Sequence, residues 1–270
     1  MTHRPVHAVL AATALSIGAS SALAAPSPVP SLSVSSGYEG SLLIKLLDLR
    51  LRTRASGGHF STDVHVESSG AVSFIRRFDI NAASVGAFDR GRAMPAAYVQ
   101  HNLEGRKRSS RTVVYRTASY AVDPLTQGLR LTATPLSSAP CPGVTPISDG
   151  KQRYDLILNY RGPGVLAPGQ KGFGLVQPVQ CRLDVRPISG FKTNNQQGLH
   201  RFVQGDIRAT FAKAPAAGVW VATDISADTL VGGLHLRLTS FSIQGNRAAF
   251  EAPAAQPAPA RPAPRRRRHR

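Results

Sequence analysis

Short segments of alternating polar and apolar residues, separated by turn residues, recur along most of this chain. In Leu47–Arg54, LDLRLRTR, the leucines share one side and the charged residues share the other, which predicts a half-buried strand. Gly57-Gly58 and Ser68-Ser69-Gly70 bracket HFSTDVHV, a second alternating segment, and lead into AVSFIRRFDI. A spacing of about ten residues per strand and turn is typical of sandwiches, barrels and curved antiparallel sheets. The sequence therefore predicts an all-β fold, mainly antiparallel, formed by a strongly curved sheet or an open barrel.

The same rhythm continues after these three segments. Ala83–Phe88, AYVQHNL and RTVVYRTA predict further strands, and so do HRFVQGDIRATF, GVWVATDIS and TLVGGLHLRLTSFSIQ near the C-terminus. Asp123-Pro124-Leu125 interrupts the pattern, because an aspartate followed by a proline is typical of the first turn of a helix. We therefore expect at most one or two short helices.

The ends of the chain have a different composition from its centre. Residues 1–24 combine Arg4, a small and apolar stretch, and Ala22-Leu23-Ala24, which predicts a secretory signal peptide. A transmembrane anchor is disfavoured, because serines and a glycine interrupt a stretch shorter than the ~20 apolar residues of a span. Residues 25–37 are expected to be a flexible lead, residues 38–250 a single β-rich domain, and residues 251–270 a disordered tail rich in Pro, Ala and Arg. The protein is therefore expected to be periplasmic or otherwise exported.

Export makes the two cysteines informative. Cys141 and Cys181 are the only cysteines in the sequence, and in an oxidising compartment they most simply form one disulfide. The alternative is a reactive thiol with a partner histidine, but neither cysteine lies in a motif typical of such a site. The stretch from Cys141 to Phe191 also contains two alternating segments, RYDLILNY and VQCRLDVRPI, joined by a Gly/Pro-rich connection. We expect the disulfide to join parts of the β-rich domain.

Several local motifs together resemble the family catalogued as domain of unknown function 3108. The motifs are Tyr38-Glu39-Gly40, the polar turn before Arg111–Arg116, Asp123-Pro124-Leu125, the segment DGKQRYDL, and Cys181-Arg182 followed by Pro187–Gly190. The resemblance covers about Tyr38 to Gln244. It implies a mostly β, exported bacterial envelope protein with no established catalytic residues. The long basic tail departs from the family's pattern.

The chain is strongly basic, with a formal net charge of +18. This charge favours attraction to lipopolysaccharide phosphates, anionic phospholipid or acidic polysaccharide. Nucleic acid would suit the charge equally well but lies in the wrong compartment, so it is not expected as a partner. Arg76 and Arg77 lie in an alternating segment and can simply be solvated. The residues predicted to bind an anionic surface are Arg106, Lys107, Arg108, Arg111, Arg265, Arg266, Arg267, Arg268 and Arg270.

Catalytic and metal-binding motifs are absent from the sequence. No nucleophile elbow, phosphate-binding loop, zinc-protease motif or carboxylate pair occurs, so we do not expect an enzyme or a cofactor. Asp63 and His65 share one face of a strand, but no third ligand stands at a matching spacing, so no metal site is expected. Asp149-Gly150 is read as a hairpin turn.

Two functions follow from these features. In the first, the curved sheet binds an amphipathic or anionic envelope component, such as a lipid or lipopolysaccharide, and basic residues meet the headgroup. In the second, the protein is a structural envelope-integrity factor with a filled core, and its basic tail tethers it to an anionic surface. Inward and outward residues alternate in the same way whether the curved sheet encloses a packed core or a ligand cavity, so the sequence does not distinguish the two. Nothing in the sequence indicates an oligomeric state. The residues predicted to line an apolar interior are Leu47, Leu49, Leu156, Leu158 and Trp220.

Overall fold

A single antiparallel sheet dominates the computed structural model, which describes residues 29–70, 73, 77–116, 121–191, 203–229 and 232–251. Within these ranges the sheet has 12 strands in the order β6-β5-β4-β3-β2-β1-β12-β11-β10-β9-β8-β7. Strands that follow each other in the sequence pair with each other, except β6 and β7, which form the two edges of the sheet. Strand β1 pairs with β12 as well as with β2 and so joins the two halves of the sheet. The strands are β1 (Ser31–Ser41), β2 (Lys45–Ser56), β3 (His59–Ser68), β4 (Phe78–Asp89), β5 (Arg92–Glu104), β6 (Lys107–Val114), β7 (Gly143–Ser148), β8 (Arg153–Pro163), β9 (Val176–Ser189), β10 (Val203–Ala214), β11 (Val219–Thr229) and β12 (Gly232–Gly245).

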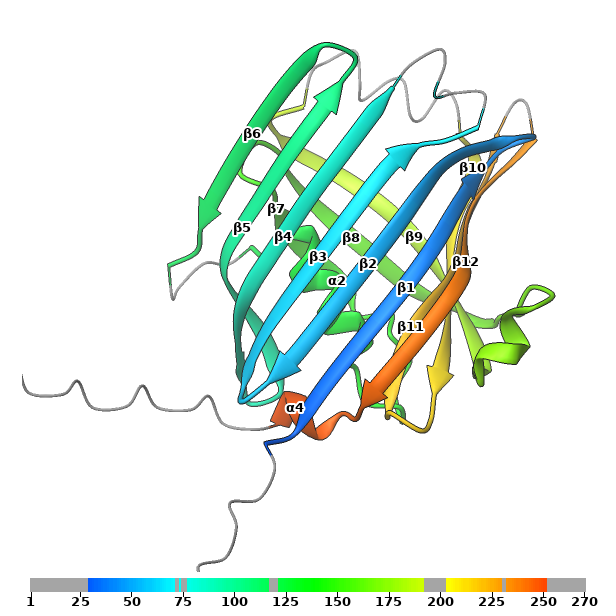
Figure 1. Cartoon of the computed structure of the whole chain (residues 1–270). Helices are drawn as coiled ribbons and strands as arrows, with labels where there is room; N and C mark the ends of the chain where they lie inside the picture. The colour runs from blue at the N-terminus through cyan, green and yellow to red at the C-terminus, as the bar shows by residue number, and fades with distance from the viewer. Residues whose placement is uncertain are drawn as a thin grey trace, which may run out of the picture.

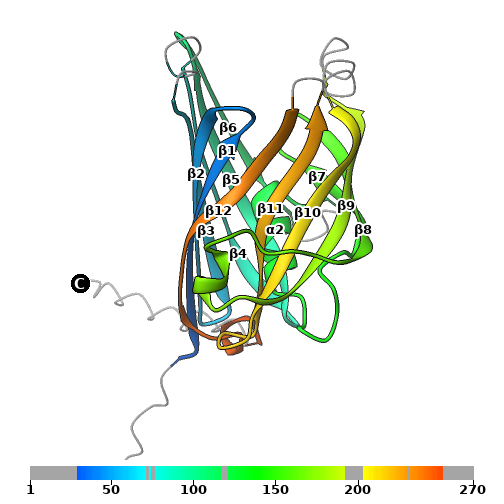
Figure 2. The same ribbon diagram turned by 90° about the vertical axis from the view of Figure 1, so that its right-hand side faces the viewer.

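The sheet is strongly curved and does not close. Figure 1 shows the half formed by β1–β6 lying across the half formed by β7–β12, with a short helix between them. Figure 2 shows that the halves diverge toward the end that carries the β1–β2 turn, which we call the wide end, and approach each other at the opposite, narrow end. The helical segments are α2 (Pro124–Thr132), the 3₁₀ turn η1 (Gln170–Phe173) and α4 (Ala248–Glu251). The predicted all-β, antiparallel and curved architecture with short helices is confirmed.

The first strand begins earlier than predicted. Residues 25–37 were expected to be a flexible lead, but β1 starts at Ser31 and lies at the centre of the sheet, between β2 and β12. Leu32 and Val34 face inward and are buried. Ser31, Ser33 and Ser35 occupy the alternate positions and are more exposed. The Pro/Ser-rich composition obscured this alternation, because only two of the first inward positions carry an aliphatic side chain. Residues 1–28 and 252–270, which hold the predicted signal peptide and almost all of the predicted tail, lie outside the described residues.

Helix α2 lies between the halves and begins as the sequence indicates. Asp123 caps it: one carboxylate oxygen accepts hydrogen bonds from the amides of Leu125 and Thr126, at 3.0 and 2.8 Å. The other oxygen accepts from the hydroxyls of Thr126 and of Ser84 on β4. Asp123 is completely buried, so these bonds replace the water that its carboxylate loses on folding. The cap therefore also attaches the helix to the β1–β6 half.

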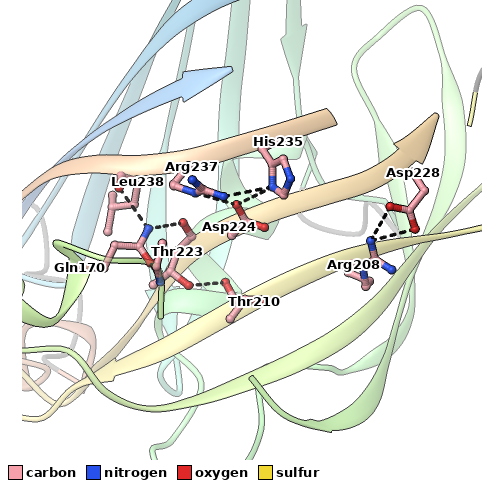
Figure 3. Close-up of polar contacts among 10 residues, drawn as sticks. Gln170, Arg208, Thr210, Thr223, Asp224, Asp228, His235, Arg237 and Leu238 are labelled. Carbon is pink, nitrogen blue, oxygen red and sulfur yellow. Dashed lines mark hydrogen bonds and ion pairs between the residues drawn. The ribbon is translucent and has the colours of Figure 1, made fainter. Parts of the chain in front are cut away.

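Strands β11 and β12 pair only over part of their length. Their register runs from Thr229↔Gly232 to Asp224↔Arg237 and ends there. Beyond this point the buried side chain of Gln170, from η1, donates to the carbonyl oxygens of Thr223 and Leu238, at 2.9 and 3.1 Å (Figure 3). The connection between β8 and β9 thus satisfies backbone groups that the parting strands leave unpaired.

The outer face of the same strands carries ion pairs. Asp224 lies 3.3 Å from His235 and 3.5 Å from Arg237, and Arg208 contacts Asp228 at 3.0 Å (Figure 3). These side chains are partly exposed, so the pairs contribute little to stability and mainly set the polar character of this face.

Side chains join the two edge strands where the sheet nearly closes. Arg111 of β6 donates to Asp149, in the β7–β8 turn, at 2.6 Å. The Tyr115 hydroxyl donates to the carbonyl of Ser148 at 2.7 Å, and Val122 makes a parallel bridge with Ile147 of β7. A second carboxylate oxygen of Asp149 accepts from the amides of Lys151 and Gln152, which agrees with the predicted turn. The edges are therefore held together without a continuous ladder of backbone hydrogen bonds.

The core fills the narrow end. One cluster contains Phe60, Phe88, Leu129 and Phe250, and it places α4 across this end of the sheet. A second cluster contains Leu131, Leu158, Cys181 and Trp220, between α2 and the β8–β11 strands. The predicted disulfide between Cys141 and Cys181 is confirmed, and it attaches the segment after α2 to β9.

Candidate ligand-binding surface

The inner face of the sheet changes from buried to exposed along its strands. On β2, Ala55 and Thr53 are buried near the narrow end, whereas Leu51, Leu49 and Leu47 are only partly buried toward the wide end. The same change occurs on β3, where Phe60 and Thr62 are buried and Val64 and Val66 are not. It also occurs across the sheet on β8 and β9. Leu158 and Cys181 are buried there, and the partly buried residues toward the wide end are Leu156, Leu183 and Val185.

We call the partly buried, inward-facing aliphatic residues the wide-end apolar surface. They keep part of their solvent contact because α2 and α4 cover only the other end of the inner face (Figure 2). Several of them, such as Leu49 and Leu156, also pack against the edge of a core cluster. Register places residues from both halves on the same face: Leu236 pairs with Gly40 of β1 and with Ile225 of β11. The surface consists of Leu47, Leu49, Leu51, Val64, Val66, Leu156, Leu183, Val185, Ile225 and Leu236.

The rim of the wide end combines apolar and basic turns. Leu43 and Ile44, in the β1–β2 turn, are 78% and 53% exposed. Arg106, Lys107 and Arg108, in and after the β5–β6 turn, are exposed at the same end of the sheet. The two turns are separated by β3 and β4 (Figure 1). Large aliphatic side chains in water are unfavourable, so Leu43 and Ile44 are candidates for contact with an apolar partner.

The predicted lining residues separate into two groups. Leu47, Leu49 and Leu156 belong to the wide-end apolar surface. Leu158 and Trp220 are each 1% exposed and lie in the packed core beneath α2, where the Trp220 indole donates to the carbonyl of Pro135 at 3.3 Å. Leu51, Val64 and Leu236 were not predicted as lining, although Leu51 and Val64 follow from the same alternation that placed Leu49 inward.

The predicted anion-binding residues also differ in their surroundings. Arg106, Lys107 and Arg108 are exposed at the rim. Arg111 is partly buried and forms an ion pair with Asp149, so its side chain helps to hold the two edge strands together. Arg265, Arg266, Arg267, Arg268 and Arg270 lie outside the described residues, as does Arg76.

The outer face of the β1–β6 half carries a shallow hollow of about 740 Å³. Its charged residues balance one another, since Arg50 and Arg52 stand beside Asp48 and Asp63. The ion-pair partner of His65 is Asp79 and not Asp63: the Nε2 atom of His65 lies 3.4 Å from Oδ1 of Asp79. Within the described ranges, no three side chains of His, Cys, Asp or Glu gather as a metal-ligand set. This hollow is therefore a weaker candidate for binding an anionic ligand.

Three tyrosines lie near the contact between the edge strands. Burial, followed by the charges of Asp149 and Asp123, raises the pKa of Tyr154 to about 12. Burial raises the pKa of Tyr98 and Tyr115 further, and their hydroxyls donate to Gln100 and to the Ser148 carbonyl. Neutral, hydrogen-bonded phenols of this kind are suited to a structural role at neutral pH.

No family model, no curated protein and no solved structure matches the chain. The resemblance to the domain of unknown function 3108 family therefore stays a prediction. No helix in the part of the chain that the structure describes is long and apolar enough to cross a membrane.

Proposed function

We propose that this protein is a non-enzymatic, exported cell-envelope protein that binds the aliphatic part of an anionic amphiphile on the wide-end apolar surface. The observation that carries the proposal is the group of leucines and valines that stay only partly buried on the inner face of both halves of the sheet. The exposed basic turn at Arg106–Arg108, at the same end of the sheet, supports an anionic headgroup, such as that of a lipid or lipopolysaccharide-like molecule.

Two further features support this proposal. A disulfide between Cys141 and Cys181 suits an oxidising compartment outside the cytoplasm. The alternative of a structural factor with a filled core accounts for the two core clusters, but it does not explain why the aliphatic residues of the wide end stay only partly buried. We therefore favour ligand binding over a purely structural function.

Replacing Leu49 by glutamine is expected to weaken the binding of an 18-carbon fatty acid by about tenfold, since a leucine side chain contributes roughly 1.5–3 kcal/mol when an apolar partner covers it. Titration of the full-length protein with a fluorescent fatty acid measures the effect. Leu49 is partly exposed but also packs against the core cluster around Phe60, so the unliganded variant should lose some stability, and thermal unfolding checks that it is still folded at the temperature of the titration.

Leu103→Gln is the matched control. Leu103 pairs with Asp79 and Arg108 and lies on the outer face of β5, so the same chemical change there should leave the affinity within about twofold. Equal affinities for wild type and Leu49→Gln, or equal losses in both variants, would contradict the proposed surface.

A further inference from the structure

The narrow end holds a second hollow that the proposed lipid site does not use. It measures about 540 Å³ and lies between the β4–β5 turn, the end of α2, the start of β7 and α4. Four arginines and one glutamate line it, so its charged side chains are predominantly cationic. These arginines are Arg90, Arg92, Arg130 and Arg247.

Two of the four guanidinium groups are already fixed in position. Arg130 donates to the carbonyl of Ala93 at 2.8 Å and to the sulfur of Met94 at 3.5 Å. Arg247 donates to the carbonyl of Ala133 at 2.7 Å and pairs with Glu251 at 3.1 Å. Anchored guanidinium groups lose little side-chain freedom when they bind an anion, which favours affinity.

The other two arginines have no carboxylate partner among the described residues. Arg90 and Arg92 are exposed and make no ion pair within those ranges. Burial, followed by the positive charge of Arg92, lowers the pKa of Arg130 to about 10. The cations in the hollow therefore repel one another, and an anion placed between them would relieve that repulsion.

The turn that presents Arg90 is unusual. Arg90 and Gly91 both have positive φ angles, 49° and 76°, and connect β4 to β5 as a two-residue turn. Such turns favour asparagine, aspartate or glycine at the first position. An arginine there is unfavourable for the backbone, and the turn directs attention to what its side chain contacts.

A buried polar group also faces the hollow. Gln127 of α2 lines it and is only 3% exposed, and its carboxamide makes no hydrogen bond with any described residue. Among the described residues, the buried and unpaired side-chain atoms belong to His65 and Ser69 and not to Gln127, so water can reach the Gln127 amide in the unliganded protein. With no protein partner of its own, this amide can donate to a ligand that accepts hydrogen bonds. Two carbonyl oxygens at the end of α2 already accept hydrogen bonds, that of Ala133 from Arg247 and that of Arg130 from the Thr134 hydroxyl. Their repulsion of a bound anion is therefore reduced.

From this geometry we propose that the narrow-end hollow is a binding site for a phosphate monoester group, with Arg90, Arg92 and Arg130 as cationic ligands and Gln127 as a neutral donor. Guanidinium groups match phosphate oxygens in pairs, and a dianion best balances the surplus of positive charge. The site lies at the end opposite to the wide-end apolar surface and does not depend on it.

Isothermal titration calorimetry of the full-length protein with inorganic phosphate and with glycerol 3-phosphate, at low ionic strength, tests the site. We expect saturable binding at one site, weakened at least about tenfold in the double variant Arg90→Asn with Arg92→Gln, which loses two charge-assisted contacts. Asparagine suits the turn, so this variant should fold at least as well as wild type.

The matched control is Arg52→Gln with Arg54→Gln, on the outer face of β2, which removes the same charge from exposed positions. Its affinity for phosphate should stay within about twofold of wild type. Equal weakening in both double variants would show attraction by net charge alone and would overturn the site. Absence of saturable binding to either phosphate compound and to phosphatidic acid vesicles would overturn it as well.

Vesicles identify the source of the phosphate group. Co-sedimentation with phosphatidic acid vesicles that is lost in the Arg90/Arg92 variant assigns the group to a lipid headgroup. Binding of glycerol 3-phosphate without such co-sedimentation assigns it to a soluble compound, and either result supports the site.

Gln127→Leu separates binding from structure. The Gln127 side chain has no hydrogen-bond partner among the described residues, so its replacement by leucine should preserve the thermal midpoint of the phosphate-free protein, while the affinity for phosphate falls several-fold. A lower midpoint with unchanged affinity would contradict the role of Gln127 as a ligand.

Discussion

Replacing both Cys141 and Cys181 by alanine is expected to lower the free energy of unfolding by about 4 kcal/mol. The disulfide spans a sequence separation of 40, and a cross-link of this length restricts the unfolded chain strongly. It also attaches the segment after α2 to β9, next to the buried cluster around Trp220. The effect is large because typical domains are stable by only ~5–15 kcal/mol.

Urea unfolding followed by the fluorescence of Trp220, the only tryptophan, measures this change. Wild-type protein in a reductant is the control, because it should lose a similar amount of stability without a change in sequence. A loss below about 1 kcal/mol in both experiments would contradict a stabilising disulfide.

Replacing Phe250 by alanine is expected to lower the free energy of unfolding by about 3–5 kcal/mol, the usual range for a buried aromatic residue. Phe250 is completely buried, and its ring centroid lies 5.1 Å from that of Phe88 on β4. Its loss would leave a cavity at the narrow end, beneath α4, where the two halves of the sheet approach each other.

Glu251→Ala is the control for this variant. Glu251 is the next residue of α4, and its side chain is 62% exposed, so its removal should change stability by no more than about 0.5 kcal/mol. Similar small losses for Phe250→Ala and Glu251→Ala in the same urea experiment would show that α4 does not contribute to the core.

Most strands could be predicted from alternation, and the exceptions have physical causes. Leu47–Arg54 alternates clearly because one face of β2 is buried and the other is solvated. The start of β1 was missed because serine and glycine occupy several of its positions, and the resulting pattern resembles a linker. Helix α2 could be predicted from Asp123 and Pro124, because an aspartate cap and a proline in the first turn favour a helix start whatever the tertiary contacts of the helix.

The candidate sites were predicted only in part, because alternation identifies a face but not its position along a strand. Leu49 and Leu158 both face inward, yet Leu49 is partly exposed and Leu158 is buried, since α2 covers only one end of the inner face. The narrow-end hollow was not predicted at all. Its arginines come from β4–β5, α2 and α4, and only the folded chain brings these segments together.

Native mass spectrometry of the protein purified gently from the compartment to which it is exported tests the proposed function most directly. We expect the intact chain to carry an amphiphile that dissociates on activation, and we expect Leu49→Gln to carry less of it. Wild-type protein recovered in full yield, correctly disulfide-bonded and free of any bound amphiphile, would contradict a lipid-binding role for the wide-end apolar surface.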